Sequence, residues 1–480
     1  MQIPIGIDLG TTNSLIAGKI GDRIAVLPNA EGKLLTPSVV ALLSGGDMLV
    51  GQQAIDWAER CPQDMVSSVK RSMGSLTKFA LPHGELTPVT ASAAILRKVI
   101  ADAERYLATT ISDVVITVPA YFNARQREDT ANAADLAGLR VLRILNEPTA
   151  AALTFGLGNE NPQTVVVWDL GGGTFDVSVL RIGYGVYQVL AVDGDQRLGG
   201  DDWDQAIAHW LRQSWEKTGV MSWPEPELAY RLRLVAEHSK RLLSEAPTVE
   251  MDIANLALPA VNELPSNCLV ISRQQFQSLT AHLCERLVAP TERALRAAGL
   301  VPANVERVIL AGGATRMPAV QELAMRLFGQ PPDSSLHPDL VVATGAALQA
   351  AILVGGEQRY TLIDVVPFAV GIATEKGMFT QLIPANSPIP TQTSRIFTNA
   401  RDDQGSVFIQ VLQGEHPRAA DNENLGYFEL PIPPLPRGMA RIEVSFELDA
   451  SGILHISAQD LLEDLARQVE IVNVGKITAV

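Results

Sequence analysis

Residues 8–14 read Asp-Leu-Gly-Thr-Thr-Asn-Ser, and residues 169–176 read Asp-Leu-Gly-Gly-Gly-Thr-Phe-Asp. Each stretch follows one apolar run and precedes another, which predicts a turn between two strands. A second pair of similar turns, at residues 116–120 and 309–313, comes in the same order along the chain. This order predicts two duplicated α/β halves that face each other across a cleft.

The two Asp-Leu-Gly stretches have the composition of phosphate-binding loops. Glycine lets backbone N–H groups approach phosphate oxygens closely, and threonine hydroxyls add donors. Asp8 and Asp169 begin the loops, and carboxylates there suit a shared Mg²⁺ ion held mainly through water. One such loop alone would ordinarily be a plain turn, but two in duplicated halves indicate a nucleotide site. The candidate phosphate contacts are Gly10, Thr11, Thr12, Asn13, Gly171, Gly172, Gly173 and Thr174.

The composition is that of an acidic globular protein, with 480 residues, a net charge of −15 and 47% apolar residues. This length predicts roughly two to four domains. The acidic balance argues against a general nucleic-acid binder or a binder of anionic membranes. We expect neither a membrane span nor a signal peptide, because no apolar run is long enough and no basic stretch precedes one at the start. The three cysteines, Cys61, Cys268 and Cys284, suit a reducing cytoplasm and no disulfide scaffold.

The chain changes character near Gly355. Before it, β-rich runs such as 114–118 alternate with helical patterns at 91–107 and 228–243, which predicts an α/β fold. After it, short alternating runs and turn residues predict an all-β sandwich. Its expected strands include 406–412, 441–448 and 453–457, with a hairpin loop at 449–452.

The joint between the two parts mixes apolar with charged residues over 356–364. This composition fits a segment that docks as a strand. It fits a mere tether equally well.

Three further charged residues are candidates for the hydrolysis of a terminal phosphate. A water that attacks phosphorus needs positioning and charge neutralisation more than a strong base. Glu147 could orient that water, Lys70 could neutralise developing charge, and Asp176 could accept a hydrogen bond behind them. Taken alone, Lys70 fits a surface lysine, and Glu147 fits a carboxylate at a helix N-terminus.

A helical pattern predicts one wall of a base pocket. Residues three, four and seven apart share a helix face, as do Glu237, Lys240, Arg241 and Ser244. A carboxylate and an ammonium can hold ribose hydroxyls, and a guanidinium plane can stack on adenine. The ordinary alternative is a solvated charged face. The opposite wall would come from Gly312, Gly313 and Arg316, with Asp339 behind them.

With these motifs in place, the sequence resembles the DnaK-type chaperones, the seventy-kilodalton heat-shock family. The resemblance covers nearly the whole chain in order. The matching stretches are IGIDLGTTNS (5–14), VITVPAYFN (115–123), ILNEPTAAAL (144–153), WDLGGGTFDVSVL (168–180), LGGDDWD (198–204), VILAGGATRMPAVQ (308–321), TGAALQAAIL (344–353), VLQGEHPRAADNENLGYFEL (411–430) and PRGMARIEVSFELDASGILHISAQD (436–460).

The resemblance implies an actin-like ATPase domain at residues 1–355, a linker at 356–364 and a β-sandwich peptide-binding domain at 365–480. It implies ATP or ADP with Mg²⁺ as cofactors and adds nucleotide contacts at Gly199, Gly200 and Asp201. Pro119 and Arg127 match the relay between nucleotide and linker, and Arg143 matches the docking place of a J-domain co-chaperone. The hydrolytic positions of the family fall on Asp8, Lys70, Glu147, Asp169, Thr174 and Asp176.

In the second domain, the resemblance implies a groove for extended apolar segments of unfolded polypeptides. Glu375 opposite the small Ala400 departs from the apolar arch that the family places over the peptide. For Val407 and Ile409, alternation alone favours ordinary sandwich core. The groove positions are Ile372, Thr374, Glu375, Phe397, Thr398, Ala400, Val407 and Ile409.

Two further departures concern partners and the end of the chain. The stretches 70–114 and 244–271 are short for the family, which argues against a GrpE-like nucleotide-exchange factor. No helical pattern follows the last expected strand at 469–474, which fits a form without the family's helical lid and fits a shortened piece of a longer chain equally well.

The leading hypothesis is therefore an ATP-dependent cytoplasmic chaperone, in which ATP loosens the peptide groove and slow hydrolysis tightens it. A non-catalytic scaffold that keeps ATP as a structural ligand is the alternative, motivated by Glu375 and the expected lack of a lid. A small-molecule kinase on the same superfamily fold ranks last, because it gives the β-sandwich no role.

Overall fold

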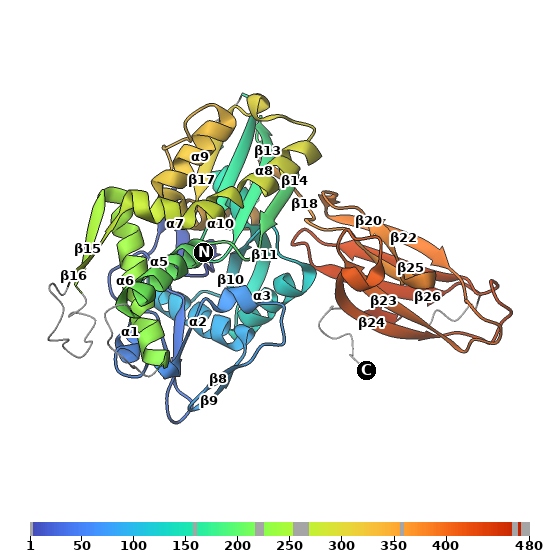
Figure 1. Ribbon diagram of the computed structural model, residues 1–480. Helices are drawn as coiled ribbons and strands as arrows, with labels where there is room; N and C mark the ends of the chain where they lie inside the picture. The colour runs from blue at the N-terminus through green and yellow to red at the C-terminus, as the bar shows by residue number, and fades with distance from the viewer. Residues whose placement is uncertain are drawn as a thin grey trace.

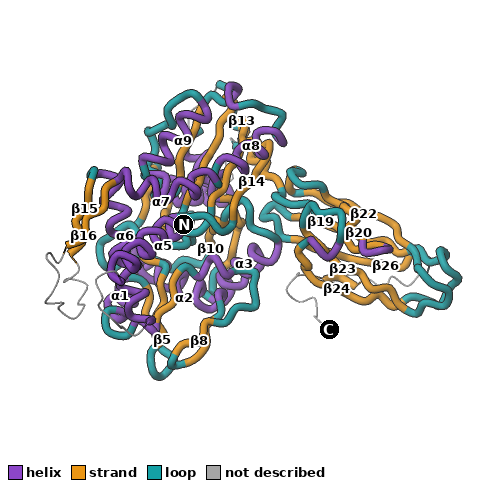
Figure 2. Tube along the Cα trace, viewed as in Figure 1, coloured by secondary structure: helices purple, strands orange, loops and turns teal. Residues whose placement is uncertain are grey.

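The computed structural model describes residues 3–156, 161–216, 225–252, 268–355, 360–462 and 469–471. Figure 1 shows a larger part, in which helices and sheets are mixed, and a smaller part made of strands at the right of the view. Figure 2 shows the same division by secondary structure. Every α-helix of the described residues ends at or before Gly355, where the sequence predicts the change of character.

The first six-stranded sheet consists of β1 (Ile5–Asp8), β2 (Asn13–Ile20), β3 (Arg23–Val26), β4 (Thr36–Pro37), β10 (Asp113–Val118) and β11 (Arg140–Asn146). The order is β11-β10-β1-β2-β3, with β4 paired to β2. Strand β1 pairs in parallel with β10 and antiparallel with β2. All residues of β10 are buried, which suits an apolar run covered on both faces.

The second six-stranded sheet repeats this path. Its strands are β12 (Gln163–Leu170), β13 (Phe175–Gly183), β14 (Val186–Asp195), β17 (Arg307–Ala311), β18 (Thr361–Val365) and β21 (Pro388–Ile389). Strand β12 pairs in parallel with β17 and antiparallel with β13. Asp8 lies opposite Thr117 in the first sheet, and Asp169 lies opposite Ala311 in the second. Four strands therefore follow the same order in the two sheets, β10-β1-β2-β3 in the first and β17-β12-β13-β14 in the second, as the repeated motifs predict.

Two helices pack between the sheets, α4 (Glu147–Phe155) and α10 (Val341–Gly355). Their contacts are close because small residues line them: a methyl group built on Gly345 would lie 1.9 Å from the carbonyl oxygen of Ala150. One built on Gly6 would lie 2.0 Å from the backbone nitrogen of Ala347, which joins β1 to α10. Small residues thus bring α4, α10 and β1 into close contact in the buried core between the sheets.

The remaining helices cover the outer faces of the sheets. The predicted helices at 91–107 and 228–243 are confirmed as α2 and α6. The helices are α1 (Gln52–Ala58), α2 (Pro88–Leu107), α3 (Ala124–Leu136), α5 (Gly200–Glu216), α6 (Glu225–Glu245), α7 (Arg273–Glu285), α8 (Val288–Ala297) and α9 (Pro318–Phe328). Short sheets border them, formed by β5 (Val39–Leu42), β6 (Met48–Val50) and β7 (Met65–Ser67), by β8 (Phe79–Leu81) and β9 (Gly84–Leu86), and by β15 (Thr248–Asp252) and β16 (Cys268–Ser272). None of the described helices combines the length and apolar character needed to cross a membrane.

The smaller part is built from two four-stranded sheets that share one apolar core. One holds β19 (Val370–Thr374), β20 (Met378–Ile383), β23 (Ser406–Gln413) and β24 (Glu423–Pro431). The other holds β22 (Thr391–Phe397), β25 (Ile442–Leu448), β26 (Leu454–Asp460) and β27 (Val469–Ile471). Buried and less buried residues alternate along β25 and β26, the pattern of a sandwich with one wet face. The predicted hairpin at 449–452 is confirmed, since Leu448 pairs with Leu454 across it.

The joint docks as a strand. Thr361, Leu362 and Ile363 pair in parallel with β14 at the edge of the second sheet. Of the two alternatives that composition left open, the structure therefore shows the docked strand for the described residues of the joint. Residues 356–359 lie outside the described ranges.

Candidate functional site

The two candidate phosphate loops face each other directly. A methyl group built on Gly172 would lie 1.9 Å from Thr12 Oγ1, and one built on Gly173 would lie 2.8 Å from Thr11 Cγ2. One built on Gly199 would lie 2.4 Å from the carbonyl oxygen of Gly172, so a third glycine turn completes the cradle. Only glycine allows such an approach of backbone to backbone. Together the contacts gather Gly10, Thr11, Thr12, Asn13, Gly171, Gly172, Gly173, Thr174, Gly199 and Gly200.

Three carboxylates lie together at this cradle, of which Asp169 and Asp176 are buried and Asp8 is half-buried. Burial, with the charge of Glu147 next in weight, raises the pKa of Asp8 to about 7. The same two causes raise the pKa of Asp176 to about 7, although the backbone N–H of Tyr121 donates a 2.8 Å hydrogen bond to it. Burial also raises the pKa of Asp169 well above its usual range. Such a set is short of positive charge, since carboxylates crowded in a dry site disfavour one another's ionised form.

The carboxylates fit a divalent cation. One oxygen of Asp169 and one of Asp176 are buried without a hydrogen-bond partner among the described residues. Oxygen ligands with several waters are what Mg²⁺ prefers, and Asp8 begins the opposite loop as predicted. When bound, the ion would neutralise phosphate charge at this place.

Lys70 and Glu147 are brought together from distant parts of the chain. Lys70 lies in the short 3-10 helix η2 (Val69–Ser72), and Glu147 is the first residue of α4. Their side chains are buried and form an ion pair, and the Lys70 ammonium lies 5.8 Å from the centre of the Phe122 ring. Because Lys70 is buried, the alternative of a surface lysine is wrong. A buried lysine needs a charged partner, and Glu147 is that partner.

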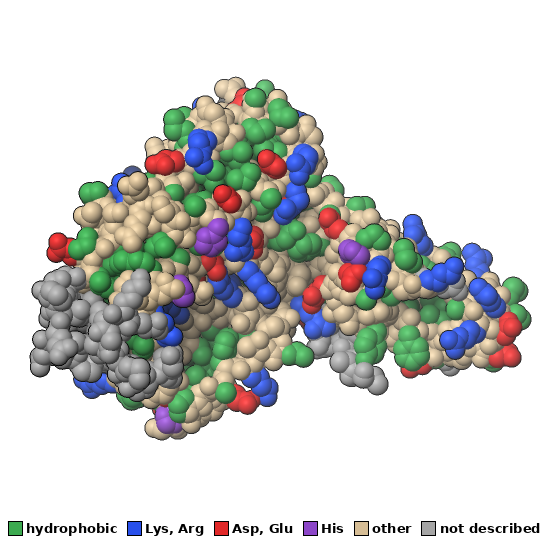
Figure 3. Space-filling view, viewed as in Figure 1, with side chains coloured by type: hydrophobic (Ala, Val, Ile, Leu, Met, Phe, Trp, Pro, Cys, Tyr) green, Lys and Arg blue, Asp and Glu red, His purple; other side chains and the backbone are tan. Residues whose placement is uncertain are grey.

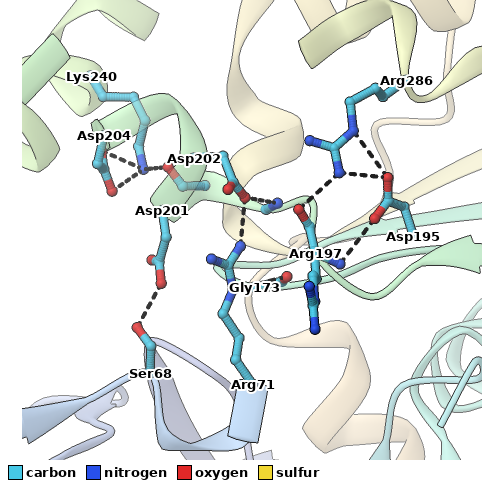
Figure 4. Close-up of polar contacts among 12 residues, drawn as sticks. Ser68, Arg71, Gly173, Asp195, Arg197, Asp201, Asp202, Asp204, Lys240 and Arg286 are labelled. Carbon is cyan, nitrogen blue, oxygen red and sulfur yellow. Dashed lines mark hydrogen bonds and ion pairs between the residues drawn. The ribbon is translucent and has the colours of Figure 1, made fainter. Parts of the chain in front are cut away.

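Polar contacts cross the cleft beside this pair (Figure 4). Ser68 Oγ donates to Asp201 at 2.6 Å, and Arg71 donates to Asp202 at 2.5 Å. Arg71 Nε also donates to the carbonyl oxygen of Gly173 at 3.1 Å. Figure 3 shows basic side chains gathered in the middle of this face, between the upper and lower halves of the larger part. These contacts hold the two halves together over the phosphate cradle.

Sequence reasoning missed Ser68, Arg71 and Asp202, whose contacts join the two halves. It also missed Asp204, which pairs with Lys240. Arg71 directly follows Lys70, and both aspartates stand in the stretch LGGDDWD. That adjacency was the available signal, but it does not say which halves the side chains join.

Helix α6 carries the residues predicted for the first wall of a base pocket. Lys240 does not lie on a solvated face: its Nζ donates to Asp204 at 2.8 Å and to the carbonyl oxygen of Gly200 at 3.0 Å. Burial raises the pKa of Asp204 to about 6, against the lowering effect of Lys240. The other predicted members on this helix are Glu237, Arg241 and Ser244; Arg241 is exposed and the other two are half-buried.

The residues predicted for the opposite wall lie in and around η5 (Gly313–Arg316). Arg316 donates to Asp339 through Nε at 3.1 Å and Nη2 at 2.7 Å, and Nη2 lies 3.2 Å from His337 Nε2. Gly312 has a φ of +81°, and a methyl group there would lie 2.4 Å from the carbonyl oxygen of Leu170. Arg316 is thus held in one plane at the rim of the pocket.

The residues predicted to line a peptide groove differ in their exposure. Ile372 and Ile409 are buried in the sandwich core, whereas Phe397 and Val407 pack against it half-buried. Thr374 donates to the carbonyl oxygen of Met378, and Thr398 and Ala400 are exposed. Glu375 opens the short 3-10 helix at Glu375–Gly377, but its side chain lies outside what the structure describes.

A comparison with protein families agrees with this geometry. The family model described as Hsp70 protein matches residues 4–81 and 76–479. This chain belongs to the Hsp70 family. Hsp70 proteins are ATP-dependent chaperones and ATPases that bind ATP or ADP with Mg²⁺, unfolded polypeptides and J-domain co-chaperones.

In this Hsp70, the two parts of the chain are tied beside the cleft. Arg127 donates to Asn146 Oδ1 at 2.6 Å and to the carbonyl oxygen of Ser451, in the β part, at 3.2 Å. Asp364 of the joint accepts from Asn146 at 2.9 Å and from Thr149 at 3.2 Å. The resemblance predicted a role at this joint for Arg127. Nothing in the sequence pattern singled out Asp364.

Proposed function

We propose that this Hsp70 hydrolyses ATP slowly in the cleft and uses the nucleotide to control how tightly its β part holds extended apolar peptide segments. Residues 1–355 would be the nucleotide-binding domain, 356–364 the linker and 365–480 the peptide-binding domain. The observation that carries the proposal is the place of Asp364. Its carboxylate is held by Asn146 and Thr149, which flank Glu147 in the sequence.

The hydrolytic roles follow from the geometry of the cradle. The Lys70 ammonium would leave Glu147 for a phosphate oxygen and neutralise developing charge, and Glu147 would then orient the attacking water. Thr174 and Asp176 support the phosphate side, because Thr174 gives a hydrogen bond to Asp176. Asp8 and Asp169 would hold Mg²⁺ mainly through water.

The coupling follows from the position of the joint. A phosphate or water that draws Glu147 moves the start of α4, and the start of α4 holds Asp364. The docked β part also touches the larger part at Ser451, whose Oγ accepts from the backbone N–H of Ile144. We propose that ATP favours this docked arrangement, in which the groove is loosened, and that hydrolysis releases it.

The partners would be unfolded or extended polypeptide segments and a J-domain co-chaperone that docks near Arg143, and the setting would be the cytoplasm. Arg143 lies on β11 close to the joint, and burial lowers the pKa of its guanidinium although Asp364 opposes this. A positively charged side chain short of partners beside the linker suits an acidic group on a docking protein.

Single-turnover hydrolysis of Mg·ATP tests the catalytic assignment. Lys70→Ala should lower the rate at least about a hundredfold, because it removes the cation nearest the water-orienting carboxylate. Glu147→Gln should lower it about tenfold or more, while both variants still bind ATP. Lys98→Ala is the matched control, since Lys98 is a half-buried lysine paired with Asp102 away from the cleft. Equal rates in wild type and Lys70→Ala would favour the non-catalytic scaffold instead.

A further inference from the structure

A buried carboxylate lies behind the base pocket without a role in the assignments above. Asp204, on α5, is 4% exposed. Both of its carboxylate oxygens lie 2.8 Å from Nζ of Lys240 on α6. Figure 4 shows the two side chains reaching toward each other from neighbouring helices, next to the glycine turn. The pair therefore fixes the end of a long and otherwise flexible side chain.

The ammonium group is fixed from a second side. Its Nζ also donates to the carbonyl oxygen of Gly200 at 3.0 Å. A methyl group built on Gly200 would lie only 3.0 Å from Nζ, so glycine leaves the room that the ammonium occupies. An ammonium has three N–H donors, and the carboxylate and the carbonyl take two of them. One donor is left at a set place between the phosphate turn and the face of α6.

We propose that Asp204 is a positioning residue that holds Lys240 against the sugar of the nucleotide and makes the site select ribose over a sugar without hydroxyl groups. The inference rests on the proposed nucleotide site. Lysine has a flexible four-carbon stem, and ordering it costs rotamer freedom. Because the ion pair orders the stem before the nucleotide arrives, the remaining donor is pre-organised for a hydroxyl.

Selection for ribose follows from the chemistry of such a donor. A site built to hydrogen-bond a substrate hydroxyl rejects an analogue that lacks it, because the buried donor is then left unpaired. The competing role for Asp204 is a plain tie between α5 and α6. That role predicts a less stable protein with an unchanged preference between sugars.

The test compares the affinities of Mg·ATP and Mg·2′,3′-dideoxy-ATP for the full chain by isothermal titration. Wild type should bind ATP at least about tenfold more tightly than the dideoxy analogue. Asp204→Asn and Lys240→Met should each reduce that preference to within about threefold. The double variant should show no further loss beyond Lys240→Met, because Asp204 acts through Lys240.

Asp102→Asn is the matched control. Asp102 is also 4% exposed and also pairs with a lysine, Lys98, but on α2 and away from the sugar. It should keep the full preference for ATP. Thermal unfolding of each variant shows that the fold is retained.

The pH dependence gives a second readout. Burial raises the pKa of Asp204 to about 6, and the charged groups that act on it are Lys240, Glu237 and Asp201. The wild-type preference should therefore fall below pH 6, where Asp204 becomes protonated and releases Lys240, whereas Asp204→Asn should show a constant ratio. Groups of the phosphate cradle that titrate in the same pH range affect the two affinities equally, because both ligands carry the same phosphates. They therefore leave the ratio of the affinities unchanged.

A folded Asp204→Asn variant that keeps the wild-type preference for ATP overturns the inference. A folded variant whose affinities for both ligands fall by the same factor overturns it too. A folded wild type that binds neither ligand instead overturns the proposed nucleotide site, so the two failures are distinguishable.

Discussion

At the scale of single residues, the cleft gathers carboxyl groups whose pKa values are raised. Asp8 and Asp176 have pKa values raised to about 7, in both cases chiefly by burial. Burial also raises the pKa of Asp169 well above its usual range. Burial of carboxylates is costly unless positive charge arrives, and Lys70 is already engaged with Glu147. Mg²⁺ bound with a nucleotide would bring positive charge to these carboxylates.

This arrangement predicts how the stability of the ligand-free protein depends on pH. A carboxyl group with a raised folded-state pKa binds more protons in the folded than in the unfolded state between about pH 4 and pH 7. Stability should therefore fall as pH rises through that window, by on the order of 1 kcal/mol per pH unit for one such group. Thermal unfolding from pH 5 to 8 measures this fall, which should be smaller in Asp176→Asn and in the presence of Mg·ATP. A variant curve parallel to wild type would contradict the assignment.

Residue types along the chain predicted the phosphate cradle well, and the reason is local. Glycine and threonine in a tight turn carry their chemistry in the turn itself, so Gly172, Gly173 and Thr12 could be found from the sequence. Asp204 and Ser68 could not, because each acts on a side chain more than thirty residues away. Ile372 and Ile409 illustrate a different difficulty, since one alternation pattern describes both groove and core.

At the scale of elements, the short helix η2 and the residue before it join the two halves across the cleft. Ser68 begins it in the left-handed region, with φ at 54°, and donates across the cleft to Asp201. Ser67, just before it, accepts from Arg233 on α6 at 2.6 Å. A non-glycine residue in this region is strained, so the crossing hydrogen bonds help to hold the backbone there.

Ser68→Ala should therefore speed nucleotide release. The change removes one hydrogen bond to a carboxylate that closes the halves, while the backbone stays the same. Loss of such a bond corresponds to an acceleration of about threefold to tenfold. Displacement of a fluorescent ADP analogue by excess ADP measures the rate. Ser75→Ala is the matched control, because the Ser75 hydroxyl bonds within its own loop, to Ser72 and Thr77. Equal release rates in the two variants would count against this role of Ser68.

The element pattern was predictable where burial is uniform along a run. Strand β10 and helix α2 show this, since their apolar residues sit at one spacing throughout. The docked strand β18 was undecided from composition, because its partner β14 lies far away in the sequence. Pairing with a distant edge is a tertiary property and leaves no local signal.

At the scale of the whole molecule, the two parts meet where the cleft chemistry can be felt. The ring of Tyr121 lies 4.3 Å from that of Phe368, which follows the joint, and the backbone N–H of Tyr121 donates to Asp176. Asn386 of the β part accepts from the backbone N–H of Val192 on β14 at 3.0 Å. On the proposed function, these contacts would let a nucleotide-dependent shift in the cleft favour or release the docked β part.

Asp364→Asn should uncouple the two parts. It removes the charge that Asn146 and Thr149 hold at the start of α4, so ATP should speed peptide release by less than half of its wild-type effect. Single-turnover hydrolysis without peptide should persist within about threefold, because the cradle is unchanged. Stopped-flow release of a fluorescent peptide gives the first quantity and phosphate production the second. Asp102→Asn serves again as control; full acceleration by ATP in Asp364→Asn would show that coupling runs elsewhere.

The most direct test of the central claim is the release of a fluorescent apolar peptide from the full chain, with and without saturating Mg·ATP. The account predicts that ATP speeds release, because nucleotide and peptide must weaken each other's binding. In Lys70→Ala and Glu147→Ala, the slow hydrolysis that restores tight binding should be lost. A peptide that does not bind, or whose release is the same with and without ATP, would contradict the account and favour the scaffold.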